Sequence, residues 1–273
     1  MFTTLSELET VRHARWRAMA GESPAPTPLQ DWITAQGLAP LSPWPSAPPS
    51  LAWRTETLAD TDGIMLQELE IALEKQQVIE TPLWPVPVYI GRECFPWAYS
   101  LIGERDLAGG VRRQMRMGRQ SPLSVQILEL LRAPHPQTIP ELRRAVGGEK
   151  TSELAIAEAL EKLQSAAWVL RLGRREGLGL WQATSLAWPE LPRLAQTYSK
   201  ASAAANFIIR YLECMLAATE PELSDFFRPL IPASRLQSGL RALTSGGYLR
   251  PANIAGTPAW ELTGSELPAI QPE

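Results

Sequence analysis

The chain has 273 residues, of which 45% are hydrophobic, so it is long enough for two or three small domains and too apolar for wholesale disorder. Its net charge of −3 does not indicate a nucleic-acid partner, so any charge that binds DNA has to be local. Cys94 and Cys214 are far apart and lack CxxC spacing, which argues against a disulfide framework and a thiolate metal site. No segment is apolar enough for a leader or a membrane span. We expect a cytoplasmic protein that makes no membrane contact and is nucleoid-associated if it binds DNA.

The N-terminal hundred residues contain helical patterns, a proline-rich segment and a predicted hairpin. The helical patterns lie at 5–20, 27–37 and 60–80, and the hairpin at 82–95. The segment at 37–54 carries five prolines, which exclude a helix interior or a central strand there. It also holds Trp44 and Trp53, which a solvated spacer would not normally carry. Because long ordered loops in compact domains are usually functional, we expect a shaped loop at a site position.

The middle of the chain has the clearest local signals. Ser121 is a predicted N-cap followed by proline, and Thr138 with Glu141 has the spacing of a capping box. Gly147 ends that short helix, and a third helix then leads into a β-hairpin that turns at glycines. Helix, short helix, helix and hairpin is the order of a winged helix-turn-helix.

The same order recurs near the C-terminus, which indicates internal repetition. The predicted fold is mainly α with small β-hairpins (α+β), in three tandem winged-helix domains. The expected units are a winged helix with a long proline-rich loop at 1–104, a basic connecting helix at 105–120, a central winged helix at 121–190, a C-terminal winged helix at 200–263 and a tail at 264–273.

Three stretches together resemble the AlkZ/YcaQ-like DNA glycosylases, which unhook alkylated or crosslinked bases. LEIALEKQQVIETPLWPVPVYIGRECFPWAYSLI is similar to the first-domain helix and hairpin of that family. FIIRYLECMLAATEPELSDFFRPLIPASRLQSGLRAL resembles its last winged helix. GLAPLSPWPSAPPSLAWR matches the segment where the family has Gly-Leu-Gln-x-Gln or Gln-x-Asp, followed by an apolar run that ends in Trp and Arg. The resemblance implies a tandem winged-helix scaffold and a double-stranded DNA partner.

The chain departs from this pattern where the family has its catalytic polar residues. Those positions fall on Ala39 and Leu41, which have no group to orient a water or stabilise an oxocarbenium-like sugar. The family's Arg-Gly-Thr-x-His-like hairpin is replaced by WPVPVYIG. The sequence therefore predicts a divergent, DNA-binding member with a degenerate active site. The alternative is an active base-excision glycosylase in which Gln36 or Asp31 holds the water, and a second alternative is a winged-helix scaffold for protein interactions.

Local charge provides the DNA-binding candidates. They share a long basic or amide side chain on a predicted helix or wing that is poor in acids. In the connecting helix they are Arg112, Arg113, Arg116 and Arg119, in the central wing Arg174 and Arg175, and in the last helix Arg235, Gln237 and Arg241. On a helix, Arg112, Arg116 and Arg119 would share one face. The competing interpretation is that these arginines pair with scattered glutamates.

We expect no cofactor and no metal site. The only histidines, His13 and His135, belong to no recognisable metal or Ser-His-Asp set, and GLGLW lacks the lysine of a phosphate-binding loop.

Overall fold

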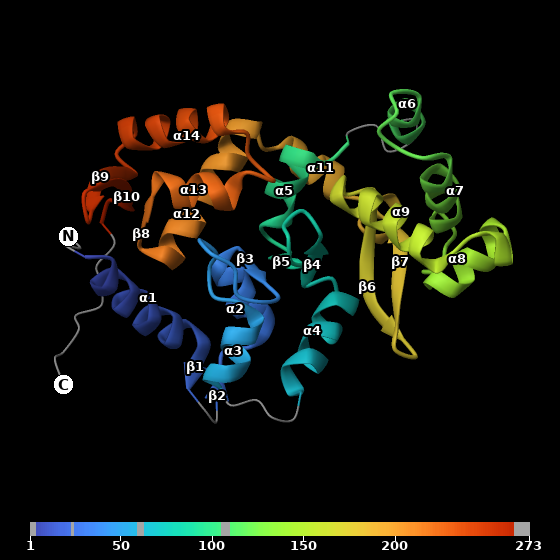
Figure 1. Ribbon diagram of the computed structural model, residues 1–273, viewed down its shortest axis with the longest axis horizontal. Coiled ribbons are helices and arrows are strands. Elements are labelled where there is room, and N and C mark those ends of the chain that lie inside the picture. The colour runs from blue at the N-terminus through green and yellow to red at the C-terminus, as the bar shows by residue number, and fades with distance from the viewer. Residues whose placement is uncertain (1–3, 23–24, 59–62, 105–109, 265–273) are drawn as a thin grey trace.

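A computed structural model describes residues 4–22, 25–58, 63–104 and 110–264, which form helices with small antiparallel sheets (Figure 1). The expected mainly α composition with small hairpins is therefore confirmed. The N-terminal elements are α1 (Leu5–Ala20), β1 (Gly21–Glu22), β2 (Ala25–Pro26), α2 (Leu29–Gln36), β3 (Leu38–Pro40), α3 (Leu51–Thr57), α4 (Ile64–Glu74), β4 (Val78–Thr81), β5 (Val88–Gly91) and α5 (Phe95–Ile102). Residues 105–109 of the expected connector and residues 265–273 of the expected tail lie outside the described residues.

The remaining elements continue in chain order from the connector to the C-terminal hairpin. They are α6 (Gly110–Arg116), α7 (Pro122–Leu131), α8 (Ile139–Val146), the 3-10 turn η1 (Gly148–Lys150), α9 (Glu153–Ser165), β6 (Val169–Arg175), β7 (Leu178–Ala183), α10 (Thr184–Ala187), α11 (Leu191–Gln196), α12 (Lys200–Met215), β8 (Ala217–Thr219), α13 (Glu220–Phe227), α14 (Ala233–Ser245), β9 (Leu249–Ile254) and β10 (Thr257–Leu262).

One order of elements occurs in three repeats: a helix, a short strand or bridge, two further helices and a hairpin. We call these the first repeat (α2 to β5), the central repeat (α7 to β7) and the last repeat (α12 to β10). The short strand extends the hairpin into the sheets β3-β5-β4 and β8-β10-β9, and in the central repeat it is reduced to a bridge between Gln137 and Trp181.

The repeats also share the way the third helix ends. Gln76, Ala167 and Gly247 follow α4, α9 and α14 with φ of 54°, 54° and 75°. In each repeat the next N–H donates to the carbonyl five positions back, at 2.8–2.9 Å. This left-handed cap satisfies a helix-end carbonyl and turns the chain directly into the hairpin.

The first repeat therefore begins at another helix than the expected domain at 1–104, which included α1. The first repeat starts at α2, and the proline-rich segment connects its first two helices and contributes β3. Helix α1 is additional, and its Arg12 side chain donates to the main-chain oxygens of Met215 and Ala217 and to the carboxylate of Glu222. The guanidinium fixes α1 to the last repeat because it satisfies three buried or half-buried acceptors there.

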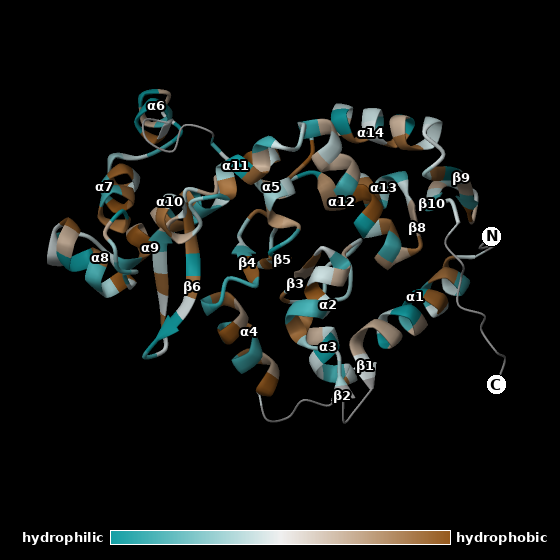
Figure 2. Ribbon diagram, turned by 180° about the vertical axis from the view of Figure 1, so that it is seen from behind, coloured by the Kyte–Doolittle hydropathy of each residue, from teal (hydrophilic) through white to brown (hydrophobic). Residues whose placement is uncertain are grey.

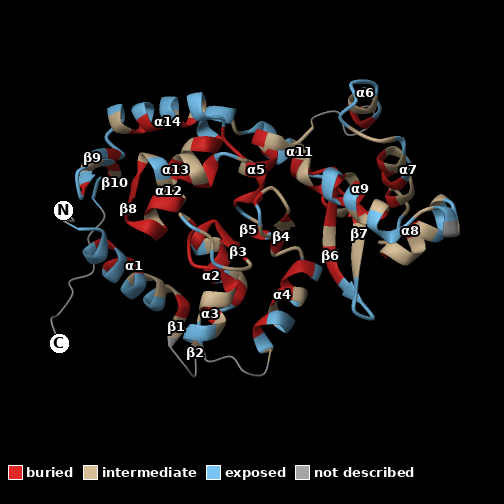
Figure 3. Ribbon diagram, in the orientation of Figure 1, coloured by how far each residue is buried: buried red, intermediate tan, exposed pale blue. Residues whose placement is uncertain are grey.

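Apolar packing joins the repeats into one body. Three tryptophans from the N-terminal part of the chain pack on the last repeat. Trp44 and Trp84 pack on Phe226 of α13, at ring-centroid distances of 5.8 and 5.9 Å, and Trp97 packs on Phe207 of α12 at 5.5 Å. Figure 3 shows the buried residues running from the first repeat into α12 and α13. The proline-rich segment is thus held against the last repeat.

Candidate nucleic-acid interface

The loop positions that the resemblance equates with catalytic residues are packed. Ala39 in β3 is fully buried and pairs with Tyr89 of β5, and half-buried Leu41 packs on the same apolar cluster. The main-chain N–H of Leu41 donates to Pro87 O at 2.8 Å. Neither side chain brings a hydrogen-bonding group to this part of the loop.

The two polar residues considered as substitutes both lie on α2, where one is buried and the other exposed. Gln36 is 1% exposed, and its amide N–H donates to the main-chain oxygen of Trp32 within α2. Its amide oxygen faces the sulfur of Cys214 at 3.8 Å. Asp31 lies on the exposed side of α2. The hydrogen-bond contacts of the Gln36 side chain therefore lie within the core.

The predicted basic helix is shorter than expected. Helix α6 ends at Arg116, and Gly118 then adopts φ of 71°, so Arg119 follows the helix instead of sharing its face. Arg112 forms an exposed ion pair of 3.3 Å with Glu129. Arg116 and Arg119 are exposed and form no ion pair within the described part of the chain.

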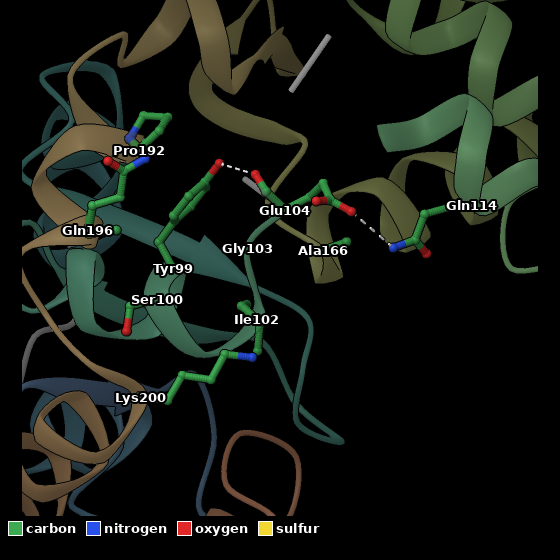
Figure 4. Close-up of a pocket in the computed structure, with 11 residues that line it drawn as sticks. Tyr99, Ser100, Ile102, Gly103, Glu104, Gln114, Ala166, Pro192, Gln196 and Lys200 are labelled. Atoms are coloured by element: carbon green, nitrogen blue, oxygen red, sulfur yellow. Dashed lines mark hydrogen bonds between the residues drawn. The ribbon is translucent and has the colours of Figure 1, made fainter. Parts of the chain in front are cut away.

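Arg113 helps to join α6 to α5. Its guanidinium pairs with the Glu104 carboxylate at 2.7 Å. Glu104 lines a cavity of about 300 Å³ between α5, α11 and the start of α12 (Figure 4). The Tyr99 hydroxyl donates to Glu104 O at 2.8 Å, and Ser100 Oγ is buried without a hydrogen-bond partner. Lys200 also lines this cavity. Arg113 therefore has a structural partner that the sequence did not reveal.

The wing arginines are also ion-paired. Arg171 in β6 is 10% exposed and contacts both Glu80 of β4 and Glu70 of α4, the latter at 2.8 Å. Arg174 pairs with Glu70 at 3.1 Å, and Arg175 pairs with Glu141 at 2.6 Å. Burial lowers the pKa of Arg171, but the charges of the two glutamates outweigh it and the net shift is upward. Arg171 and Arg174 thus hold the hairpin against the first repeat, and Arg175 ties it to α8 of its own repeat.

A glycine permits this close approach of hairpin and helix. Gly173 lies at an irregularity in the β6–β7 register, with φ of 85°. A Cβ at this position would lie 3.2 Å from Glu70 O, so a side chain would push the hairpin away from α4.

Helix α14 presents the predicted polar face to solvent. Gln237 and Arg241 are exposed, Arg235 is half-buried, and neither arginine forms an ion pair among the described residues. The amide of Gln237 donates to Glu220 at 3.2 Å. Gln237 and Arg241 line a cavity of about 460 Å³ together with Trp260 of β10. Figure 3 shows that the outer turns of this helix are exposed.

The elements that carry the predicted side chains do not all lie along one edge of the molecule. Helices α14, α11 and α6 follow one another along the upper edge of Figure 1, whereas the turn of the β6–β7 hairpin points to the lower edge. Figure 2 shows that the turn end of this hairpin is hydrophilic, in agreement with its ion-paired arginines. Helix α11, which lies between α14 and α6 in Figure 1, carries the exposed Arg193, a residue that the sequence analysis did not single out.

A larger groove between α1 and α12 involves two further arginines that the sequence analysis did not select. Arg15 and Arg210 line a cavity of about 730 Å³ together with Tyr248 and Glu213. The local signal was the run of basic residues in RHARWR, which is unremarkable in an exposed helix. Arg15 and Arg210 line the same groove only because α1 packs against the C-terminal end of α12.

The described residues lack two kinds of feature. None of their helices combines the length and apolar composition that crossing a membrane requires. They contain no group of three or more His, Cys, Asp or Glu side chains that could hold a metal ion.

No known protein family matches the sequence, and no curated protein does. Among solved structures, the chain has the fold of a DNA glycosylase. That structure is the Streptomyces sahachiroi DNA glycosylase AlkZ, with a TM-score of 0.65 and 16% sequence identity, and the match covers 100% of this chain and 74% of AlkZ. The expected AlkZ-like scaffold is therefore confirmed at the level of the fold.

Proposed function

We propose that this protein binds double-stranded DNA through three tandem winged helices and has a degenerate glycosylase site. The observation that carries the proposal is the similarity of the whole chain to the fold of a DNA glycosylase. The threefold order of helices and hairpins supports the winged-helix assignment, because each repeat has the elements of that motif in sequence.

The DNA-binding surface that we propose is the edge formed by α14, α11 and α6. Arg235 and Arg241 on α14, Arg193 on α11, and Arg116 and Arg119 at the end of α6 have no carboxylate partner among the described residues. Unpaired guanidinium groups can neutralise phosphates without first breaking an ion pair. Gln237 and Arg241 also have the side chains that suit base edges.

The other arginines that we predicted to contact DNA already have glutamate partners, so the proposed surface does not depend on them. Arg112 and Arg113 belong to α6, but each would have to give up its glutamate partner in order to bind a phosphate. Arg174 and Arg175 lie at the opposite edge and already have glutamate partners. We therefore propose that the β6–β7 hairpin packs against other elements of the chain and does not bind DNA.

The loop between α2 and α3 supports the proposal of a degenerate site. A glycosylase needs groups that orient water and stabilise positive charge on the sugar. Ala39 and Leu41 supply neither group, and Gln36 is occupied in the core. Incubation with alkylated or crosslinked duplex should therefore give no abasic sites, and their steady accumulation above that in a matched protein-free reaction would contradict the degenerate site.

The DNA-binding proposal is tested by a salt titration of duplex affinity. Wild-type protein should bind a 20-base-pair duplex at low salt, and log K should fall linearly with log salt. The double variant Arg235→Ala/Arg241→Ala should weaken binding and reduce the slope by about two, because each lost phosphate contact lowers it by about one.

Arg228→Ala is the matched control. This exposed arginine of the same repeat is ion-paired with Asp225 at 3.2 Å, so its loss should leave the slope unchanged. An equal effect of the control and the double variant would remove α14 from the interface. The absence of any binding at low salt would favour the protein-interaction scaffold.

A further inference from the structure

The groove between α1 and α12 has the composition of a ligand site. Its volume of about 730 Å³ falls within the range of roughly 300–1,000 Å³ that is usual for small-molecule sites. Its walls come from parts of the chain that are far apart in sequence, among them Arg15 and Met19 on α1, Ile209 and Arg210 on α12, and Tyr248 before β9. The groove therefore combines two cations, an aromatic ring and aliphatic surface.

The two guanidinium groups are held in place by the same residue. Arg15 Nε donates to Glu213 O at 2.7 Å, and Arg210 Nη1 pairs with the Glu213 carboxylate at 3.0 Å. Among the described residues that line the groove, one carboxylate stands against two cations, which leaves an excess positive charge of one. Oriented guanidinium groups with remaining donors are suited to a phosphate.

Arg210 is also positioned by the proline-rich loop. Its side chain lies directly over Gly37, where a Cβ would come within 2.6 Å of Arg210 Cγ. Gly37 has φ of 83°, a conformation that other residues rarely adopt. The first residue of the loop therefore leaves the space in which Arg210 lies.

Tyr248 supplies an aromatic surface in an unusual position. It follows the left-handed cap of α14, and its side chain is 61% exposed. Trp168, which occupies the same position in the central repeat, is 1% exposed and lies in the core. Residues at this position of a helix cap usually make an apolar contact with the helix, so the last repeat presents an aromatic ring that the central repeat buries.

We propose that the α1–α12 groove binds one nucleotide unit, with the phosphate on Arg15 and Arg210 and the base against Tyr248. A phosphate alone would not need the aromatic and aliphatic walls, and an apolar ligand would not need the guanidinium groups. The unit is either a free nucleotide or an unpaired nucleotide of DNA. The second source rests on the proposed function, and the first does not.

The first arm of the test uses free ligands and the full-length protein. Deoxythymidine monophosphate should bind in equilibrium dialysis at least about tenfold more tightly than thymidine, because only the nucleotide reaches the guanidinium groups. Arg210→Ala should reduce nucleotide affinity by about tenfold and leave thymidine unaffected. Arg228→Ala is the control, since it also removes an arginine that is ion-paired three residues away on a helix.

The second arm compares a fully paired duplex with one that carries a single unpaired thymidine. Wild-type protein should prefer the bulged duplex by about tenfold, as expected for stacking of one base on an aromatic side chain. Tyr248→Ala should abolish the preference and Tyr248→Phe should retain it. Circular dichroism of each variant checks that the exposed substitution leaves the fold intact.

The outcomes separate this inference from the proposed function. Binding of the free nucleotide without a bulge preference supports the groove as a free-nucleotide site. Salt-dependent duplex binding, with no bulge preference and no nucleotide binding, would overturn the groove and leave the proposed function intact. Equal nucleotide affinities of wild type, Arg210→Ala and Tyr248→Ala would also overturn it.

Discussion

Replacement of Arg171 should expose the energetic role of the ion-pair network between the first and central repeats. Arg171→Met keeps much of the apolar stem but removes the guanidinium that contacts Glu70 and Glu80. The side chains of the three residues are 10%, 26% and 15% exposed, so two carboxylates would remain in a poorly solvated space. One oxygen of Glu70 already has no hydrogen-bond partner.

Loss of one member of a buried ion pair costs about 3–5 kcal/mol, chiefly because the partner remains buried and uncompensated. Glu70 keeps its ion pair with Arg174, so Glu80 is the carboxylate that loses its partner, and we expect a loss of about 3 kcal/mol in the free energy of unfolding. The measurement is urea unfolding followed by tryptophan fluorescence. Glu80→Gln in the Arg171→Met background should recover part of the loss, since it removes the stranded charge.

Arg228→Met is again the control, because its pair with Asp225 is exposed and should contribute less than about 1 kcal/mol. A loss below about 1 kcal/mol for Arg171→Met, or no recovery on adding Glu80→Gln, would refute the argument that stranded charge dominates.

Three further changes test other parts of the structure. Glu222→Gln should flatten the dependence of stability on acid pH. Burial raises the pKa of the Glu222 carboxyl, but the charge of Arg12 and the hydrogen bonds from Thr219 and Arg12 outweigh burial, so the folded pKa lies below the ordinary 4.5. The stability that Glu222 contributes above pH 4.5 is therefore lost as the pH falls through the folded pKa. Urea midpoints measured from neutral pH downward should therefore converge for wild type and variant in acid. Thr138→Ala should cost about 1 kcal/mol of unfolding free energy, because it removes a capping box. Gly37→Ala should cost about 1 kcal/mol or more through its positive φ and should also displace Arg210, which a loss of nucleotide binding in equilibrium dialysis would report.

Local signals correctly predicted several elements. Ser121 caps α7, and Thr138 with Glu141 forms the capping box of α8. Gly147 follows α8 with a positive φ, as the sequence indicated. These features depend on backbone groups within a few residues of one another, so their chemistry is present in the local sequence.

The position of α1 could not be obtained in the same way. Its helical pattern is evident, but its attachment depends on Arg12 reaching Met215 and Glu222, about two hundred positions away in the chain. The hydrophobic pattern of Leu5–Ala20 is equally compatible with a first helix of the N-terminal repeat. The proline-rich segment was correctly recognised as ordered, but its contact with Phe226 was not foreseeable from its composition.

The sequence by itself determined the helices, their caps and hairpins, because hydrogen bonds and hydrophobic periodicity act over short stretches of chain. Tertiary structure alone decided which arginines remain open to a ligand. Arg171, Arg174 and Arg175 meet glutamates supplied by other elements, whereas Arg15 and Arg210 line the same groove. The physical reason is that the binding role of a guanidinium depends on the charges and solvent around it, and these come from segments remote in sequence.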